Sequence, residues 1–378
     1  MELMMKMSEA ALREYGVYPE LLSEKIASAK NADAVIAALN NADVTGASLK
    51  IFDTASAKVF EGMKLLGTLA GTDNLVLHIP AYAAALATKL ADEAEKNGVK
   101  IVVGIVNKRA AAASLVTHIL SCVDVADINA GCYNNGTYVS VDGGELYKAD
   151  PATRLCDLLP ASVKGVQAGY KVYNADVLGK TIAEVNPENG VINSINADDC
   201  VVDLVDKHLV DCRVQSCGKC VFCREGLLQL EAMQKDITVG KGRMDEIDIT
   251  REIGDAMTYS TPCSMGQMSS LMATSAVDAF AGEYEEHIKK KKCRAEVCKA
   301  FQKVYVDPSA CIGCEKCAPA CPENAIDGAQ GYIHVVFDNW CTRCGECISA
   351  CPEGAIHKTT ERTPKLPDRM MRVGRFTK

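Results

Sequence analysis

Two cysteine-rich phrases near the C-terminus constrain this chain of 378 residues more than any other feature. They read CIGCEKCAPACPENAI, which starts at Cys311, and CTRCGECISACPEGAI, which starts at Cys341. Each places three cysteines at two-residue gaps and a fourth after three more residues, directly before a proline. Such gaps let one tight loop supply three ligands to one centre, and soft thiolates suit iron–sulfur clusters or zinc. The repeat therefore predicts two metal centres.

The full spacing, C-x2-C-x2-C-x3-C-P, is that of bacterial two-cluster ferredoxins, in which the fourth cysteine of each run ligates the other cluster. We therefore predict two [4Fe–4S] clusters with exchanged ligands, which would lock the repeats together. The ligands would be Cys311, Cys314, Cys317 and Cys351 for one cluster, and Cys341, Cys344, Cys347 and Cys321 for the other. Structural zinc is the alternative, but zinc knuckles do not require four cysteines and a proline twice.

A third group lies upstream in SCGKCVFCREG, where Cys217, Cys220 and Cys223 again stand at two-residue gaps. No fourth cysteine follows closely, and the first candidate is Cys263 in STPCSMGQM. Both segments precede predicted helices, whose free N–H groups and dipole favour the negative charge of a cluster. Spacing alone leaves both a cluster and zinc open at this site.

Three further cysteines, Cys200, Cys293 and Cys298, suggest a fourth centre. Cys293 and Cys298 follow His287 closely in HIKKKKCRAEVC, and Cys200 lies just before a predicted helical bundle. One histidine and three cysteines make a closed tetrahedral zinc site, which would join the ferredoxin module to the bundle.

The remaining cysteines and histidines show no catalytic pattern. We expect small buried hydrophobic roles for Cys122, Cys132, Cys156 and Cys212, and satisfied core or surface roles for His78, His118 and His208. No Ser/His/Asp or Cys/His pair indicates a hydrolytic centre.

Composition indicates a globular cytoplasmic protein, with 48% hydrophobic and 24% charged residues, that divides into two to four compact units. Nineteen cysteines in a reducing cytoplasm favour metal ligation over disulfides. The net charge of -8 argues against a nucleic-acid partner held by phosphate contacts. No export signal is apparent, and the longest apolar run, VKIVVGIV, is far short of the roughly twenty residues of a membrane span.

The order of elements predicts an α/β plus α+β multidomain protein. Residues 1–60 suggest helices with polar interruptions, and residues 74–106 have the lengths of a strand, helix and strand in a βαβ crossover. Short β-type pieces follow, and then a helical region over residues 223–290. The basic tail, residues 358–378, is expected to be solvated or to dock on an acidic partner subunit.

The run SCGKCxxCREG, the distant TPCSMGQ and the trailing EYEEHI resemble the iron–sulfur end of the NADH-binding flavoprotein subunit of respiratory complex I. They also resemble its relatives in electron-bifurcating, NAD-linked iron hydrogenases. The resemblance covers residues 196–357 and implies that Cys217, Cys220, Cys223 and Cys263 hold a [4Fe–4S] cluster in a four-helix bundle. Hydrogenase-type members carry a C-terminal two-cluster ferredoxin module as well, and some carry a site comparable to the predicted zinc site.

The resemblance also implies a domain order. It places a degenerate α/β scaffold of the FMN- and NADH-binding type at 1–154, a β-grasp-like module at 155–205, the helical bundle at 206–292 and the ferredoxin module at 293–357. The family's Gly-Arg-Gly-Gly-Ala-Gly-Phe loop is missing, as is its Asn-Ala-Asp-Glu stretch. The segment LGKT also lacks the preceding glycine of a phosphate loop, because Asn174 stands there. We therefore expect a truncated relative without FMN.

These features predict a non-catalytic electron-transfer subunit with three [4Fe–4S] clusters in a larger, anaerobic oxidoreductase complex. The resemblance implies partners: a flavoprotein or NAD(P)-binding subunit, a small thioredoxin-like [2Fe–2S] subunit, a catalytic subunit and soluble ferredoxin. It is compatible with electron bifurcation at a partner's flavin. Two alternatives remain open at this point, a divergent FMN-binding NAD(P)H dehydrogenase subunit and a zinc-rich interaction module without redox function.

Overall fold

A computed structural model describes residues 2–16, 20–367 and 370–376. The chain forms two compact units, which are described one at a time below. The first contains Met1–Ala197, Leu204–Gln234 and Asp245–Ala281, and the second contains Asp198–Asp203, Lys235–Met244 and Gly282–Lys378. The second unit therefore includes two short segments, Asp198–Asp203 and Lys235–Met244, that lie between parts of the first unit in the sequence. No helix in the described ranges is long and apolar enough to cross a membrane.

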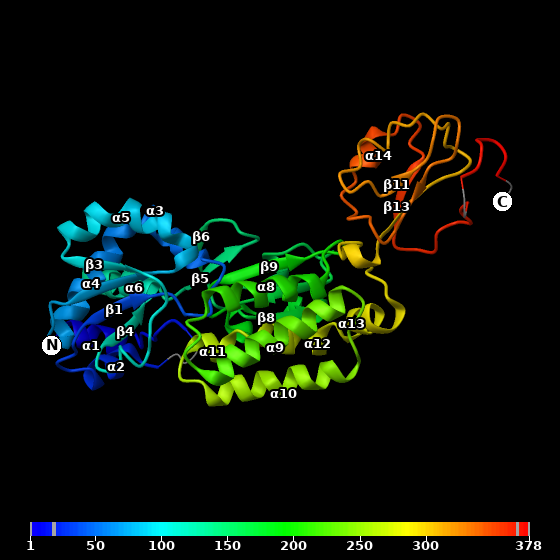
Figure 1. Cartoon of the computed structure of the whole chain (residues 1–378). Helices are drawn as coiled ribbons and strands as arrows, with labels where there is room; N and C mark the ends of the chain where they lie inside the picture. The colour runs from blue at the N-terminus through cyan, green and yellow to red at the C-terminus, as the bar shows by residue number, and fades with distance from the viewer. Residues whose placement is uncertain (1, 17–19, 368–369, 377–378) are drawn as a thin grey trace. The chain divides into compact units, whose positions relative to one another are not determined.

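The first unit starts with a four-stranded parallel sheet in the order β3-β2-β1-β4. Figure 1 labels β1, β3 and β4 of this sheet. Its strands are β1 (Val35–Ala38), β2 (Leu75–Ile79), β3 (Val99–Val103) and β4 (Leu115–His118). Its helices are α1 (Glu2–Glu9), α2 (Leu22–Ser28), α3 (Ile51–Thr54), α4 (Ser56–Ala70), α5 (Ala84–Lys96) and α6 (Ile119–Ala130).

The predicted βαβ crossover is confirmed, because β2 and β3 are parallel neighbours joined by α5. Asn97 caps the end of α5, and Gly98 follows with a φ of +68°, which glycine adopts without strain. The prediction that residues 1–60 are helical is wrong at β1. This strand is the short run VIAA, and all four of its residues are buried. It therefore lacks the alternation of buried and exposed residues that marks a half-buried strand, and nothing in its sequence separates it from the predicted helices around it.

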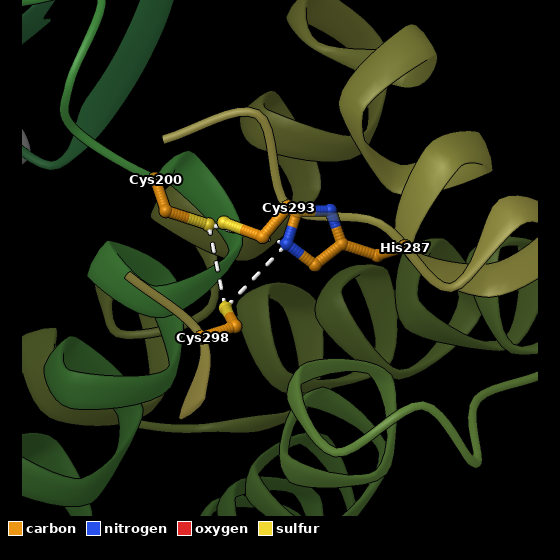
Figure 2. A group of neighbouring side chains, drawn as sticks. All are labelled: Cys200, His287, Cys293 and Cys298. Atoms are coloured by element: carbon orange, nitrogen blue, oxygen red, sulfur yellow. Dashed lines mark hydrogen bonds between the residues drawn. The ribbon is translucent and has the colours of Figure 1, made fainter. Parts of the chain in front are cut away.

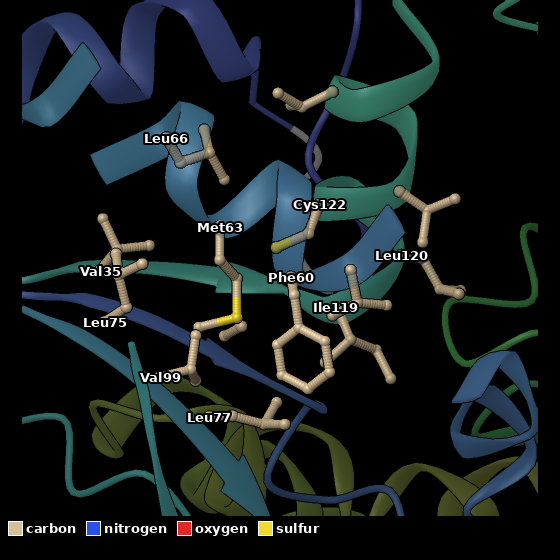
Figure 3. Close-up of a cluster of buried hydrophobic side chains, with 14 of the residues drawn as sticks. Val35, Phe60, Met63, Leu66, Leu75, Leu77, Val99, Ile119, Leu120 and Cys122 are labelled. Carbon is tan, nitrogen blue, oxygen red and sulfur yellow. The ribbon is translucent and has the colours of Figure 1, made fainter. Parts of the chain in front are cut away.

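The core of this sheet lies between its strands and the pair α4–α6 (Figure 3). Phe60 and Met63 of α4 are fully buried with Leu77 of β2 and Ile119 of α6. The two helices approach closely at Gly62, where an added Cβ would lie 1.9 Å from the carbonyl oxygen of Cys122. Glycine at this position therefore sets the distance between α4 and α6.

A second sheet of five strands follows in the order β6-β5-β9-β7-β8. Its strands are β5 (Thr137–Val141), β6 (Leu146–Ala149), β7 (Gly165–Ala168), β8 (Lys171–Asn174) and β9 (Val191–Ile195), with the short helix α7 (Ile182–Val185) between β8 and β9. The neighbours β5 and β9 are parallel, and the other pairs are antiparallel. The sheet starts well before the predicted module boundary at residue 155, because the hairpin β5–β6 completes it.

The helical region begins at Val201 and packs through small residues. It contains α8 (Val201–Gln215), α9 (Val221–Thr238), α10 (Asp245–Ser260), α11 (Ser264–Met268), α12 (Leu271–Ala279), α13 (Ala281–Glu285) and a π-helical turn, Glu286–Lys290. An added Cβ on Gly226 of α9 would lie 2.5 Å from the sulfur of Met257 on α10. The amide of Val172 in β8 donates a hydrogen bond of 3.0 Å to the hydroxyl of Ser275 on α12, which ties the bundle to the second sheet.

The C-terminal module has little regular structure. Antiparallel pairs join β10 (Lys303–Val306) to β13 (Ile356–Thr359) and β11 (Ile326–Asp327) to β12 (Val335–Val336), and α14 (Glu346–Ala350) is one short helix. Part of the basic tail, residues 370–376, lies along this module with several exposed side chains. There the amide of Ile333 donates to the carbonyl of Met371 at 2.9 Å, and that of Val373 donates to Gly331 at 3.1 Å.

Gly62→Ala should destabilise the first unit, because the methyl group would overlap the Cys122 carbonyl and force α4 away from α6. Overpacking costs about 1–3 kcal/mol, whereas the better helix propensity of alanine offsets about 1 kcal/mol at most. We expect a lower midpoint in urea unfolding followed by circular dichroism. Gly179→Ala is the matched control, since no atom lies within 4 Å of its added Cβ. Equal midpoints for the two variants would contradict the close helix approach.

Candidate cluster and metal sites

Four cysteines drawn from both repeats line one cavity of the C-terminal module, which we call the first cage. They are Cys311, Cys314, Cys317 and Cys351. The walls between them are mostly apolar and include Val306, Ile312 and Ile356. Burial, followed by the nearby thiols of the same quartet, raises the pKa of Cys317 to about 11. Four ionised thiols in this cavity therefore need a cationic centre among them.

The other four cysteines of the repeats line a second cavity, the second cage. They are Cys321, Cys341, Cys344 and Cys347, and the walls include Val304, Ile326 and Val336. Burial and the nearby thiols of Cys341 and Cys344 raise the pKa of Cys347. The structure thus brings together the two quartets that the sequence predicts, including the exchange of Cys321 and Cys351 between repeats.

Backbone N–H groups point at the sulfurs of both cages. The amide of Ala325 donates to Cys321 Sγ at 3.2 Å, and the equivalent amide of Ala355 donates to Cys351 Sγ at 3.3 Å. The amide of Arg343 donates to Cys341 Sγ at 3.4 Å, from a residue with a φ of +58°. Such donors stabilise negative charge on sulfur, so the two cages fit anionic clusters.

The third quartet lies in the first unit. Cys217 and Cys220 precede α9, Cys223 is in its first turn, and Cys263 directly precedes α11. Burial raises the pKa of Cys223, and the charges of Cys263, Cys220 and Cys217 raise it further. Cys263, forty residues further along the chain, therefore comes close enough to Cys223 for its charge to act on that thiol.

The fourth group is the tightest (Figure 2). Cys200 precedes α8, His287 lies in the π-helical turn, and Cys293 and Cys298 lie in the loop that follows. All four are buried, belong to the second unit and place their ligand atoms within 4.8 Å of one another. The structure therefore brings together all four residues of the predicted zinc site.

The distances in this group fit tetrahedral zinc. Zn–S bonds of about 2.3 Å and Zn–N bonds of about 2.0–2.1 Å at tetrahedral angles correspond to S···S separations of roughly 3.8 Å and S···N separations of roughly 3.5 Å. Cys200 Sγ lies 3.7 Å from Cys298 Sγ, and these sulfurs lie 3.3 and 3.5 Å from His287 Nε2. His287 Nδ1–H donates to the Glu283 carbonyl at 2.8 Å, which leaves Nε2 free to ligate.

The acid–base properties of the group also fit a cation. Burial opposes charge on His287, but hydrogen bonds to Cys200 and Cys293 outweigh it and raise its pKa to about 10. Contacts with Cys200 and Cys298 lower the pKa of Cys293, whereas contacts with Cys200 and Cys293 raise that of Cys298. The four side chains therefore hold protons between them, and one bound divalent ion would displace those protons.

A cavity of about 490 Å³ opens at the carboxyl ends of β1 and β4. The strand order changes direction between these strands, which is where open α/β sheets bind ligands. Its lining includes Lys25 and Lys108, together with Cys263, Ser264 and Gln267 beside the third quartet. Gly16 is the only lining glycine in the described part of the chain, so no glycine-rich loop faces this cavity.

Part of the Asn-Ala-Asp-Glu stretch is present near this cavity, although the complete stretch is missing. Residues 41–44 read Asn-Ala-Asp-Val and follow β1 after Leu39 and Asn40. The side-chain amide of Asn41 donates to the Val106 carbonyl at 2.8 Å and accepts from the Val106 amide at 3.0 Å. Asp43 is buried and accepts from the amide and hydroxyl of Thr45 at 2.9 and 2.7 Å. Both polar side chains therefore hold the loop after β1.

The structure corrects part of the expectation for the other cysteines. Cys122 and Cys212 are buried as predicted, but Cys132 and Cys156 are exposed. The histidines have internal partners: His78 contacts the Gly104 carbonyl at 3.1 Å, His118 accepts from the Leu120 amide at 3.3 Å, and His208 contacts the Ser269 carbonyl at 3.2 Å.

Comparison with known families agrees with the cysteine pattern. Residues 203–287 match the family described as the NADH-ubiquinone oxidoreductase-F iron-sulfur binding region, and residues 304–358 match the 4Fe-4S dicluster domain. The first matched segment contains the third quartet, and the dicluster domain contains both cages. The resemblance to the NADH-binding flavoproteins of complex I and NAD-linked hydrogenases is therefore confirmed.

Individual relatives show the same relationship. The NADP-reducing hydrogenase subunit HndC of Solidesulfovibrio fructosivorans is 34% identical over 140 residues, which cover 37% of this chain and 29% of that protein. An NADH-quinone oxidoreductase subunit of Streptomyces coelicolor is 35% identical over 101 residues, 27% of this chain and 22% of that protein. A crystal structure of NAD+-reducing [NiFe]-hydrogenase shares the fold, with a TM-score of 0.65 at 15% identity over 76% of this chain and 62% of that one.

We expect about one zinc per chain in protein isolated from iron-replete cells, measured by inductively coupled plasma mass spectrometry. His287→Ala and Cys298→Ser should reduce zinc to near zero, because three ligands cannot close the tetrahedron, while leaving the iron content unchanged. Cys156→Ser is the control, since this exposed cysteine belongs to none of the four groups. Wild-type protein with full iron and no zinc would contradict the assignment.

Proposed function

We propose that this chain is an electron-transfer subunit of a multisubunit, NAD(P)- and ferredoxin-linked oxidoreductase complex. It would relay single electrons through three [4Fe–4S] clusters and perform no bond chemistry itself. The observation that carries the proposal is the exchange of Cys321 and Cys351 between the two cages. Neither repeat alone completes a quartet, as two-cluster ferredoxins require.

The protein's contribution would be to hold and tune the clusters, which are one-electron carriers with potentials of about -700 to +450 mV. The walls of the cages are mostly apolar, and the amides of Ala325, Ala355 and Arg343 donate to cysteine sulfur. Both factors set how readily a cluster accepts an electron. The zinc site would be structural, because all four of its positions are filled by protein ligands.

The proposed partners follow from the relatives, which are subunits of an NADP-reducing hydrogenase and of NADH-quinone oxidoreductases. We propose a flavoprotein or NAD(P)-binding subunit, a thioredoxin-like [2Fe–2S] subunit, a catalytic subunit and soluble ferredoxin. In such an assembly, bifurcation would take place at a partner's flavin.

A second candidate function is an FMN-binding NAD(P)H dehydrogenase subunit. The cavity between β1 and β4 favours it, because it lies where α/β sheets bind ligands and reaches Cys263 of the third quartet. Against it, the lining offers one glycine, Gly16, where close backbone approach to a phosphate needs several. We therefore rank this function second.

Anaerobically purified full-length protein should be brown, bleach with dithionite and contain about twelve irons, four for each cluster. Cys217→Ser, Cys314→Ser and Cys344→Ser should each lose about four irons, because each removes a ligand from a different quartet. Cys132→Ser, at an exposed cysteine outside the quartets, should keep all of them. A colourless wild-type protein that contains only zinc would instead support an interaction module.

Acid extraction of the same protein should release no stoichiometric flavin, as measured by fluorescence against an FMN standard. The physical reason is the missing glycine-rich cradle at the cavity between β1 and β4. About one FMN per chain would reverse the ranking of the two functions. A flavoprotein of known FMN content, extracted in parallel, controls for recovery.

A further inference from the structure

The two cages are related by the internal repeat, and most of their wall residues correspond. Val306 in the first cage corresponds to Val336 in the second, and Ile356 corresponds to Ile326. Two pairs differ, and the first is Ile312 in the first cage with Thr342 in the second. The other pair involves an imidazole. The second cage has Val304 where the first has His334. The first cage therefore has an imidazole in its wall at a place where the repeat would put an alkyl group.

The imidazole of His334 is held firmly and has an unused nitrogen. The residue is 2% exposed, and its Nε2 has no hydrogen-bond partner among the described residues. The ring packs over Gly328, where an added Cβ would lie 2.3 Å from the ring Cδ2 and 2.7 Å from Nε2. Glycine at 328 thus makes room for the ring.

A buried nitrogen without a partner costs free energy unless something in the cavity accepts its hydrogen bond. Most of the first-cage wall is aliphatic and offers no side-chain acceptor. Glu353 also lines the cavity, but it is exposed and makes no hydrogen bond with His334. No sulfur of the quartet accepts from His334 Nε2 either, so the acceptor that remains is sulfur of a cluster that the quartet would hold.

We propose that His334 Nε2–H donates a hydrogen bond to sulfur of the first-cage cluster and raises the reduction potential of that cluster alone. The inference rests on the proposed function, since it requires a bound cluster. An N–H donor stabilises the reduced cluster more than the oxidised one, because reduction adds negative charge. Val304 provides no such donor in the second cage. His334 is thus a positioning and tuning residue that makes the two halves of the repeat unequal electron carriers.

The experiment uses anaerobically purified full-length protein with its full iron content. His334→Val copies the residue of the second cage and removes the donor. We expect the electron affinity of one cluster to fall on the order of tenfold, about 59 mV for a one-electron couple, in a redox titration followed by electron paramagnetic resonance. The other clusters should keep their potentials. His357→Val is the matched control, since this exposed histidine of β13 contacts Tyr305 and lines neither cage.

A second readout identifies the donor directly. In protein labelled with 15N-histidine, pulsed electron paramagnetic resonance of the reduced protein should detect a weak 15N coupling. The coupling should persist in His357→Val and disappear in His334→Val. His334→Gln keeps an N–H donor and should retain a potential close to that of the wild type, which separates hydrogen bonding from packing.

The outcomes distinguish the inference from the function on which it rests. Full iron content with unchanged potentials in His334→Val would overturn the inference and leave the three-cluster proposal standing. If His334→Val does not fold or loses its cluster, the labelled wild-type protein decides, and the absence of any 15N coupling there overturns the inference. Wild-type protein without iron would instead defeat the proposed function.

Discussion

The C-terminal module depends on its buried cysteine sulfurs, because it has too little apolar structure to form a conventional hydrophobic core. Its strands are two to four residues long, and cysteines such as Cys311, Cys317 and Cys347 are themselves part of the buried cluster. A domain this small rarely folds on hydrophobic burial alone, and metal binding is one way to supply the missing free energy. The exchanged cysteines add to this, because each repeat needs a ligand from the other.

The cysteine sites were predictable from the sequence because ligand spacing is a local property. A gap of two residues fixes how a loop turns, and the structure brings together the two quartets of the repeats and the four residues of the predicted zinc site. The short buried strand β1 and the hairpin β5–β6 were not predictable in the same way. Their positions depend on pairing with segments far along the chain, and a four-residue apolar run carries no period of its own. The contact of residues 370–376 with residues 331–333 was not predictable from the sequence for the same reason.

Buried polar side chains have different roles in the first unit and in the cages. Asn41 and Asp43 form hydrogen bonds that hold the loop after β1. Buried Glu14 accepts a hydrogen bond of 2.8 Å from the Thr117 hydroxyl and one of 2.9 Å from the His118 amide. These hydrogen bonds fasten the chain around the cavity. His334 is the opposite case, since its Nε2 is left over after folding. In the sequence, His334 stands out only because the equivalent position in the other repeat is Val304.

The π-helical turn Glu286–Lys290 has a consequence for how such sites can be lost. A π-helical turn accommodates one more residue than an α-helical turn, and it sets the direction in which His287 points. Removing one residue from this turn would restore α-helical winding and rotate the imidazole by about 100°, away from the three thiols. A homologue one residue shorter here would still have all four ligands in its sequence, yet it could not close the tetrahedron.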